Sequence, residues 1–584
     1  MSDATKKAEE FLSRERAFRL GELVTEASHP KTRTLSQTVE TDLPAAIRLL
    51  QSVDDDIPPA MEKALRQDSF NRLVDAFGEA MSAGKTIFFT GCGSTGRLSI
   101  LLEAMWRRFW RQLQQTHPET AADFPDIEDR VCSVMAGGDF ALIKSVEGYE
   151  DFPVFGRYQL RERGVQTGDV VVAITEGGET PFVIGTAWEG LKAGANVFFV
   201  YNNPSKLLCQ HVKRSREVIE EPRMTKLDLT TGPMAITGST RMQATTAELF
   251  IVGSALEIAL VRFLYEKLSP ALVEQLQLEK RETSDYFRLL SELIKQLSTP
   301  EAVDVLVRAT DFEENVYRRK GLVTYLGDSF LLDVLTDTTE RSPTFMLPPF
   351  RKCDDNRSPI SWAFVKDPFR TTEQAWYDLL QREPRGLDWE RAIYEKLKAP
   401  KNLKAKPPKL DNAEIYKFMI GNEPDPSRTD APDSALIAVT VGDKTDHLID
   451  AVLQESETPY KKKAALLIGS EVPVAGIDET FRFAYNPPDS PLQLWHHLAV
   501  KLILNTLSTA TMVCMGRVFG NAMVWLSPSN KKLIDRGCRL IAQQTDCSYE
   551  QACIALHIAM EEVEAAQQKG REVPSPVALA IQRL

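Results

Sequence analysis

Short apolar runs alternate with longer segments of helical periodicity along two stretches of the 584-residue chain. Runs of about four to eight apolar residues that end in glycine or polar turns are typical of buried parallel strands. The segments between them place apolar residues about three or four positions apart, which is typical of helices that cover a sheet. In the first stretch the runs are residues 85–90, 131–137, 169–175 and 195–202. Strands that alternate with helices predict an α/β unit whose parallel sheet lies between two helical layers.

The second stretch repeats this order, with apolar runs at residues 322–328, 435–443 and 464–470. Each stretch ends in a long apolar segment of helical period, residues 240–260 and 494–516. The repetition predicts a duplicated α/β unit, and cores that stop growing at about 250–300 residues also predict several domains. The predicted divisions are a helical N-terminal segment (1–82), a first α/β domain (83–265), a helical linker (266–318), a second α/β domain (319–525) and a helical C-terminal segment (526–584).

Composition limits the classes of partner and the compartment. The net charge is −12, whereas nucleic-acid binding needs a basic face, so we expect no nucleic-acid partner. The eight cysteines form no CxxC pair and have no histidine at zinc-ligand spacing, so we expect reduced thiols and no metal. The N-terminus is charged, and the longest apolar segments carry charges such as Glu257 and Arg262. We therefore expect a cytoplasmic protein with no membrane partner.

The turn GCGSTGR, Gly91–Arg97, lies between a predicted strand and a predicted helix. It matches GxGxxG, but a dinucleotide site also needs an acidic residue about 20 positions on, and that position falls inside the helix. A Walker A site is excluded because the turn has no lysine. We therefore expect no cofactor. Glycine N–H groups, hydroxyls and a helix N-terminus suit a phosphate monoester, held by Gly93, Ser94 and Thr95. The alternative is a tight turn whose hydroxyl only caps the helix.

Two further loops have a similar composition and position. They are TEGGETP, residues 175–181, and TGSTR, residues 237–241, which precedes the long closing helix. Because ligands gather at the carboxyl ends of parallel strands, we expect these loops to contribute to the same phosphate site. The candidate ligands in them are Thr175, Glu176, Gly177, Thr180, Ser239, Thr240 and Arg241.

Six segments between residue 85 and about residue 560 together resemble the sugar isomerase (SIS) domain. They are TGCGSTGRL, AGGDFALIKSVEGYED, VVAITEGGETPFVIG, TGSTRMQATTAE, LILNTLSTATMVCMGRVFGNAMV and SNKKLIDRGCRLIAQQTDCSYEQACIAL. More narrowly, they resemble the family that joins N-acetylmuramic acid 6-phosphate etherases with glucokinase regulatory proteins. The resemblance implies two tandem SIS domains, each a parallel-sheet αβα sandwich. Etherases pair single copies as homodimers, so a duplicated chain implies a monomer with an internal pseudo-dimer, or a homodimer.

The resemblance also implies a set of catalytic residues. The etherase reaction replaces a lactate ether at the third carbon of the sugar with water, through proton loss at the second carbon. This elimination needs a base and an acid, which in the family are two glutamates. They match Glu150 in the first copy and Glu340 in the second, since the first copy has Met105 at the position of Glu340. Lys501 matches a lysine that would neutralise the phosphate or an oxyanion, although on spacing alone it suits a surface cation.

Some residues admit another interpretation or depart from the family pattern. Glu147 and Glu150 would also suit a solvated pair on one helix face, since charged residues are mostly exposed. Gly177 stands where etherases usually have a serine. Glu176 and Glu179 add negative charge close to the expected phosphate.

We therefore expect a protein that binds a phosphorylated sugar or amino sugar, with etherase-type lyase activity as the leading hypothesis. The alternative is a sugar-phosphate-sensing regulator of a sugar kinase, although residues 483–493 replace the apolar stretch by which the regulator meets its kinase. A sugar-phosphate isomerase is a weaker third hypothesis, because the same carboxylate base would serve enolisation.

Overall fold

The computed structural model describes residues 3–146, 148–428, 431–442, 446–455, 460–567 and 574–584. Its first half contains a five-stranded parallel sheet in the order β2-β1-β3-β4-β5. The strands are β1 (Ile87–Gly91), β2 (Val131–Met135), β3 (Val170–Ile174), β4 (Asn196–Tyr201) and β5 (Met224–Asp228). Every residue of β1, β2 and β3 is buried, which explains their continuous apolar sequence.

The second half repeats the sheet in the order β7-β6-β8-β9-β10, again with all pairs parallel. Its strands are β6 (Val323–Leu326), β7 (Ala363–Lys366), β8 (Ala435–Val441), β9 (Lys462–Ile468) and β10 (Glu479–Phe483). The two sheets have one topology when β6 is matched with β1, β7 with β2 and so on in chain order. The predicted fold class, a duplicated α/β unit with helical segments at its ends, is therefore confirmed.

Three strands were not predicted, namely β5, β7 and β10. All three lie at sheet edges. In β5 and β10, partly exposed positions interrupt the buried ones, so polar residues interrupt the apolar run. β7 has only four residues. Edge position and short length thus weaken the apolar signal on which the prediction rested.

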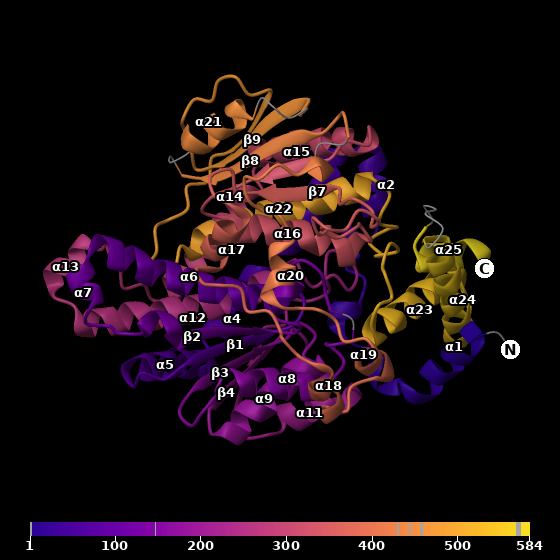
Figure 1. The fold of residues 1–584 in the computed structure, drawn as a ribbon, viewed down its shortest axis with the longest axis horizontal. Helices are drawn as coiled ribbons and strands as arrows, with labels where there is room; N and C mark the ends of the chain where they lie inside the picture. The colour runs from indigo at the N-terminus through magenta and orange to yellow at the C-terminus, as the bar shows by residue number, and fades with distance from the viewer. Residues whose placement is uncertain (1–2, 147, 429–430, 443–445, 456–459, 568–573) are drawn as a thin grey trace.

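Four long helices lie between the two sheets (Figure 1). They are α6 (Ser94–Thr116), α12 (Gln243–Lys267), α16 (Leu331–Phe345) and α22 (Leu494–Cys514). α6 contacts α16, and α12 contacts α22, so equivalent helices of the two halves meet each other. Among the described residues, α22 is long and apolar enough to cross a membrane, but 89% of its most apolar window is buried inside the protein. It is therefore a core helix of the pseudo-dimer.

The first helix, α1, packs against α24 near the C-terminus, at the side of the molecule where both termini lie (Figure 1). The N-terminal helices are α1 (Asp3–Arg14), α2 (Leu35–Thr41), α3 (Leu43–Asp54), α4 (Ile57–Leu65) and α5 (Asp68–Ser82). The C-terminal helices are α23 (Lys531–Thr545), α24 (Tyr549–Gln567) and α25 (Pro576–Arg583). The linker contains α13 (Pro270–Gln275), α14 (Thr283–Leu297) and α15 (Pro300–Arg318). The remaining helices are α7 (Pro118–Ala121), α8 (Pro153–Glu162), α9 (Pro181–Ala193), α10 (Ser205–His211), α11 (Lys213–Ile219), α17 (Thr372–Leu380), α18 (Arg391–Lys396), α19 (Lys401–Ala405), α20 (Asn412–Tyr416) and α21 (Asp446–Gln454).

A segment of the second half also packs onto the first. Arg382 and Arg385 both pair with the buried carboxylate of Glu103 on α6, at 3.0 and 2.8 Å. The Trp389 ring stacks on Tyr149, with ring centres 5.8 Å apart. The two halves therefore hold each other through buried charge pairs and aromatic contacts as well as through the four central helices.

Candidate active site

Loop 1, Gly91–Arg97, leaves the end of β1 and enters α6. Gly93 has a φ of 58° and a ψ of −122°, a combination that residues with a Cβ rarely adopt. The Thr95 hydroxyl accepts the Cys92 N–H at 2.9 Å and donates to the Cys92 carbonyl at 3.0 Å, so it shapes the loop. Ser94 is half-buried at the first helical position. The loop thus offers the Ser94 hydroxyl and the N-terminal N–H groups of α6 to an anion.

Arg97 ties loop 1 to the second half of the molecule. Its buried guanidinium donates to the Leu142 carbonyl at 3.0 Å and to the Thr339 hydroxyl at 3.3 Å. Thr339 directly precedes Glu340 on α16. Burial lowers the pKa of Arg97 and the charge of Glu340 opposes that shift, so the two side chains lie within electrostatic reach. The structure therefore brings Glu340 close to loop 1, across the interface between the halves.

Loop 2, residues 175–181, leaves the end of β3 and enters α9. The hydroxyls of Thr175 and Thr180 lie 3.0 Å apart, so they hydrogen bond across the loop. The Asn203 amide donates to the Gly177 carbonyl at 3.0 Å and fixes the turn from the outside. Loop 2 is therefore rigidly held, and the N-terminus of α9 points from it toward the same edge of the sheet as α6.

Glu179 does not bring uncompensated negative charge to loop 2. Its carboxylate pairs with Arg214 at 2.5 Å and with Lys532 at 3.2 Å. These two cations lower the pKa of the carboxyl group against the effect of its burial. Glu179 is thus a structural carboxylate that braces loop 2, α11 and α23.

Glu176 has different surroundings. Its side chain is buried, with 6% of the residue exposed. Burial raises the pKa of Glu176 to about 7; the charges of Glu340 and Glu150 act in the same direction, and Lys532 opposes them. Glu176 therefore interacts with both of the other carboxyl groups, beside loops 1 and 2.

Glu150 lies in a turn just before α8, so the expected helix face that it would share with Glu147 is wrong; Glu147 itself lies outside the described residues. The turn is held against α9 because the Phe182 N–H donates to the Glu150 carbonyl at 3.1 Å. The Asn530 amide donates to the Glu150 carboxyl at 3.0 Å. Burial raises the pKa of Glu150, and Lys532 opposes the shift. Glu150 is therefore a half-buried, hydrogen-bonded group rather than a solvated one.

Lys501 reaches from α22 of the second half to loop 3 of the first, residues 237–241. Its ammonium donates to the Arg241 carbonyl at 2.8 Å and to the Thr246 hydroxyl at 2.9 Å. It also donates to the Asn505 side chain on its own helix at 2.7 Å. Burial lowers the pKa of Lys501 to about 8, while Glu340 opposes the shift. Lys501 is thus a partly buried, hydrogen-bonded cation at the site rather than a free surface charge.

In loop 3, the Arg241 side chain has its partners in the second half of the molecule. The Arg241 guanidinium is buried and pairs with Asp337 at 3.1 Å, and it donates to the Ser508 hydroxyl at 3.0 Å. Both partners belong to the second half, so the Arg241 side chain holds the halves together. Ser239 is buried and Thr240 is partly exposed.

Two residues at the start of α23 lie near the site but were not predicted from the sequence. Asn530 caps α23 by accepting the Leu533 N–H at 2.9 Å, and it contacts Glu150 as described above. Lys532, two residues further on, faces Glu179, Glu150 and Glu176, and the charges of Glu179 and Glu150 raise its pKa against the effect of burial. The segment SNKK was part of the resemblance, but only the folding of α23 back onto the first half assigns it a place in the site.

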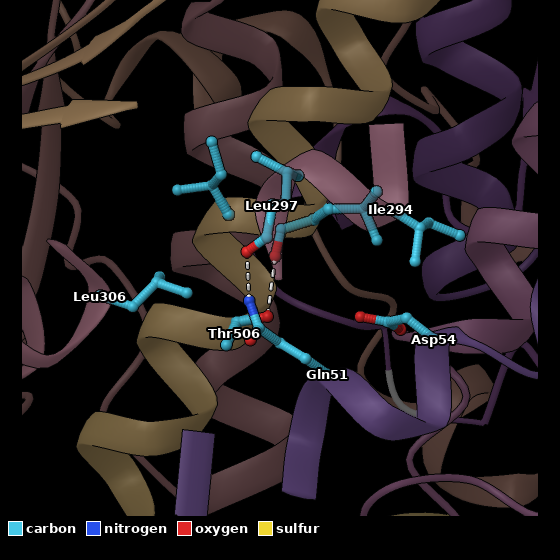
Figure 2. A pocket seen from close by; sticks show the side chains of 8 residues that line it. Gln51, Asp54, Ile294, Leu297, Leu306 and Thr506 are labelled. Atoms are coloured by element: carbon cyan, nitrogen blue, oxygen red, sulfur yellow. Dashed lines mark hydrogen bonds between the residues drawn. The ribbon is translucent and has the colours of Figure 1, made fainter. Parts of the chain in front are cut away.

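A small cavity of about 10 Å³ lies between α3, α14, α15 and α22 (Figure 2). Asp54 and Gln51 line it beside aliphatic side chains, and the Gln51 amide donates to the Leu297 carbonyl at 2.6 Å. Burial raises the pKa of Asp54 to about 7, and the charge of Lys501 opposes the shift. The cavity is too small for a sugar but has the volume of about one water molecule.

In the second half, acidic side chains follow the ends of β6 and β7. Asp328 and Asp367 follow β6 and β7, and with Asp378 they form a carboxylate group compact enough to surround a cation. Arg370 donates to Asp328 and to Asp367, at 2.8 Å in each case. An internal guanidinium thus occupies this carboxylate cluster.

Residues 70–188 match the family model described as the glucokinase regulatory protein N-terminal SIS domain. An N-acetylmuramic acid 6-phosphate etherase of Prochlorococcus marinus (strain MIT 9303) is 30% identical over 242 residues, which cover 41% of this chain and 67% of that protein. The chain belongs to the SIS family of etherases and glucokinase regulatory proteins. N-acetylmuramic acid 6-phosphate etherase 1 of Bacillus licheniformis is 28% identical, over 43% of this chain and 73% of its own.

Another family member, the etherase of Synechococcus sp. (strain CC9902), is 32% identical over 227 residues, and the match spans only 62% of that protein. Among solved structures, the C-terminal domain of glucosamine-fructose-6-phosphate aminotransferase from Francisella tularensis is similar, with a TM-score of 0.43 and 9% identity. That similarity covers 81% of this chain and 96% of the other. Tagatose-6-phosphate ketose/aldose isomerase from Escherichia coli is similar with a TM-score of 0.38 and 10% identity, over 82% and 94% of the two chains.

Proposed function

We propose that the chain is a phosphosugar-binding protein with etherase-type lyase activity toward a substrate like N-acetylmuramic acid 6-phosphate. The observation that carries the proposal is the convergence of Glu150 from the first half and Glu340 and Lys501 from the second beside loop 1. The etherase names of the relatives support the choice of reaction.

The phosphate of the sugar would lie against loops 1 and 2. Loop 1 supplies the Ser94 hydroxyl and the N–H groups at the start of α6, and loop 2 supplies the hydroxyls of Thr175 and Thr180 at the start of α9. Two helix N-termini that point toward one anion stabilise its charge without a dedicated cation. Lys532 adds positive charge nearby.

The elimination needs one carboxylate and one carboxylic acid at neutral pH. Glu150 suits the acid, because burial raises its pKa and favours the protonated form, which would protonate the departing lactate oxygen. Glu340 faces the cations Arg97 and Lys501, so its carboxylate suits the base that removes the proton from the second carbon. Water then adds to the third carbon, so substrate and water give the sugar phosphate and D-lactate.

The test is lactate release from N-acetylmuramic acid 6-phosphate. We expect D-lactate from the wild-type chain and a loss of about 10²–10⁴-fold in rate for Glu150→Gln and for Glu340→Gln, because each removes one proton-transfer group. Folding of the variants is checked by circular dichroism and thermal melting. Lactate release by wild type no faster than by the double variant would refute the lyase activity.

A second function, ligand-gated regulation of a sugar kinase, is favoured by the match of residues 70–188 to the regulatory protein's domain model. If it holds, fructose 6-phosphate should raise the melting temperature of the chain and change its inhibition of a glucokinase. Binding of the sugar phosphate without any effect on the kinase would argue against it.

A further inference from the structure

Loop 2 carries two acidic side chains with contrasting environments. Glu179 forms ion pairs with Arg214 and Lys532. Glu176 is similarly buried, yet within the described part of the chain no cation lies within ion-pair distance of it. Glu176 stands between Thr175, at the end of β3, and Gly177, in the turn that leads into α9. Glu176 is thus an acidic residue without an ion-pair partner, among the described residues, in the loop that would hold the phosphate.

Titratable groups from several elements lie around Glu176. Glu340 on α16 and Glu150 in the turn before α8 repel its charge, and Lys532 on α23 attracts it. The Cys92 thiol in loop 1 also interacts with Glu176 and contributes no positive charge. The surroundings therefore favour a neutral carboxyl group at Glu176, opposed mainly by Lys532.

Glu248 on α12 also faces Glu176 and offers no counter-charge. It is fully buried, and it accepts the Asn202 amide at 3.0 Å through one oxygen. Its other oxygen is buried and has no hydrogen-bond partner among the described residues. Burial, together with the charge of Glu176, raises the pKa of Glu248 well above its usual value. Two neighbouring buried carboxyl groups cannot both ionise without a large cost in free energy.

A phosphate dianion bound between loops 1 and 2 would add two negative charges beside this group. We propose that Glu176 is a specificity-determining residue through which the site binds a phosphate or sulfate group together with one proton. The proposal rests on the anion site of the proposed function but does not depend on the lyase step.

The sign of the effect follows from the protonation states. The free protein has Glu176 protonated below about pH 7, because its pKa is about 7. A bound dianion raises that pKa further, so binding above pH 7 takes up a proton, whereas binding at pH 5.5 does not. Between the pKa of the free protein and that of the complex, affinity for a dianion falls about tenfold for each pH unit.

The experiment measures sulfate binding by isothermal titration calorimetry, because sulfate stays a dianion throughout the pH range used. At each pH, the heats in two buffers of different ionisation enthalpy give the number of protons taken up. At pH 8 we expect the wild-type chain to take up about one proton more than Glu176→Gln, because Lys501 can take up protons in both proteins at that pH. At pH 5.5 the two proteins should take up equal numbers of protons. At pH 8 Glu176→Gln should also bind sulfate about tenfold more tightly than wild type.

Glu257→Gln is the matched control, since Glu257 is also a buried carboxyl group of raised pKa on α12, where Tyr286 and Leu492 donate to it outside the three loops. It should keep the wild-type proton uptake. Equal uptake by wild type and Glu176→Gln at pH 8, no uptake by wild type at pH 8, or no sulfate binding by either protein would overturn the inference. Lactate release is measured in parallel: proton-linked binding without lactate would refute the lyase step alone.

Discussion

Lys501 donates to main-chain and side-chain oxygens of both halves, and burial brings its pKa to about 8, close to physiological pH. The proposed function uses its positive charge beside Glu340. A cation whose pKa has fallen this far loses its charge within the pH range in which the protein remains folded. Measurements of the reaction rate at different pH values can therefore detect the titration of this ammonium group.

The pH profile of lactate release should show this titration. We expect kcat/KM to fall above about pH 8 as Lys501 loses its proton. Lys501→Arg should move this alkaline limb above pH 9, because a guanidinium keeps its charge there. Lys501→Met should be slow at every pH. An alkaline limb that stays at the same pH in Lys501→Arg would assign it to another group.

At the scale of elements, the start of α23 contributes both to the stability of the fold and to the candidate site. Asn530 accepts the Leu533 N–H as a helix cap and donates to Glu150 with the same side chain. Asn530→Ala should lower the free energy of unfolding by about 1 kcal/mol through the lost cap. Asn530→Asp should keep the cap but place a carboxylate beside Glu150, which raises the pKa of Glu150 by repulsion and alters the rate.

Urea denaturation measures the first effect of these Asn530 variants, and lactate release measures the second. The Asp variant should be nearly as stable as wild type, with a changed pH profile. If its profile matches that of wild type, the contact between Asn530 and Glu150 has no part in the reaction.

The sequence predicted the elements that local pattern determines. The buried central strands of both sheets, and loops 1 and 2 at their ends, have continuous apolar or glycine-rich sequences. The place of Lys532 could not be predicted, because α23 follows the second half in sequence and packs against loop 2 of the first. Likewise Arg241 resembles an anion ligand in sequence, and only the interface with Asp337 assigns it another partner.

At the scale of the whole molecule, the first half has the glycine- and hydroxyl-rich loops 1 and 2, whereas the second half has carboxylates paired to Arg370. The sequence shows that Asp328 and Asp367 follow the strand ends of the second half. The position of Arg370 between them could not be predicted, because it depends on the fold. Buried carboxyl groups occur in the interface as well. Asp54 lies where the N-terminal helices, the linker and the second half meet around the small cavity (Figure 2).

Asp54, which lies at this junction, should make the free energy of unfolding depend on pH. Its pKa is about 7 in the folded protein and about 3.8 in the unfolded chain, so the folded state binds more protons between those values. Its contribution to stability is therefore lost as pH rises from about 4 to 7 and is constant above that. Asp54→Asn removes the titration, so the variant should gain stability relative to wild type by ~1.4 kcal/mol for each pKa unit of the difference. Urea denaturation at pH 5 and pH 8 measures this gain, with the exposed Asp123→Asn as a control of equal charge change. If Asp54→Asn and wild type lose stability in parallel between the two pH values, the buried carboxyl group does not control the junction.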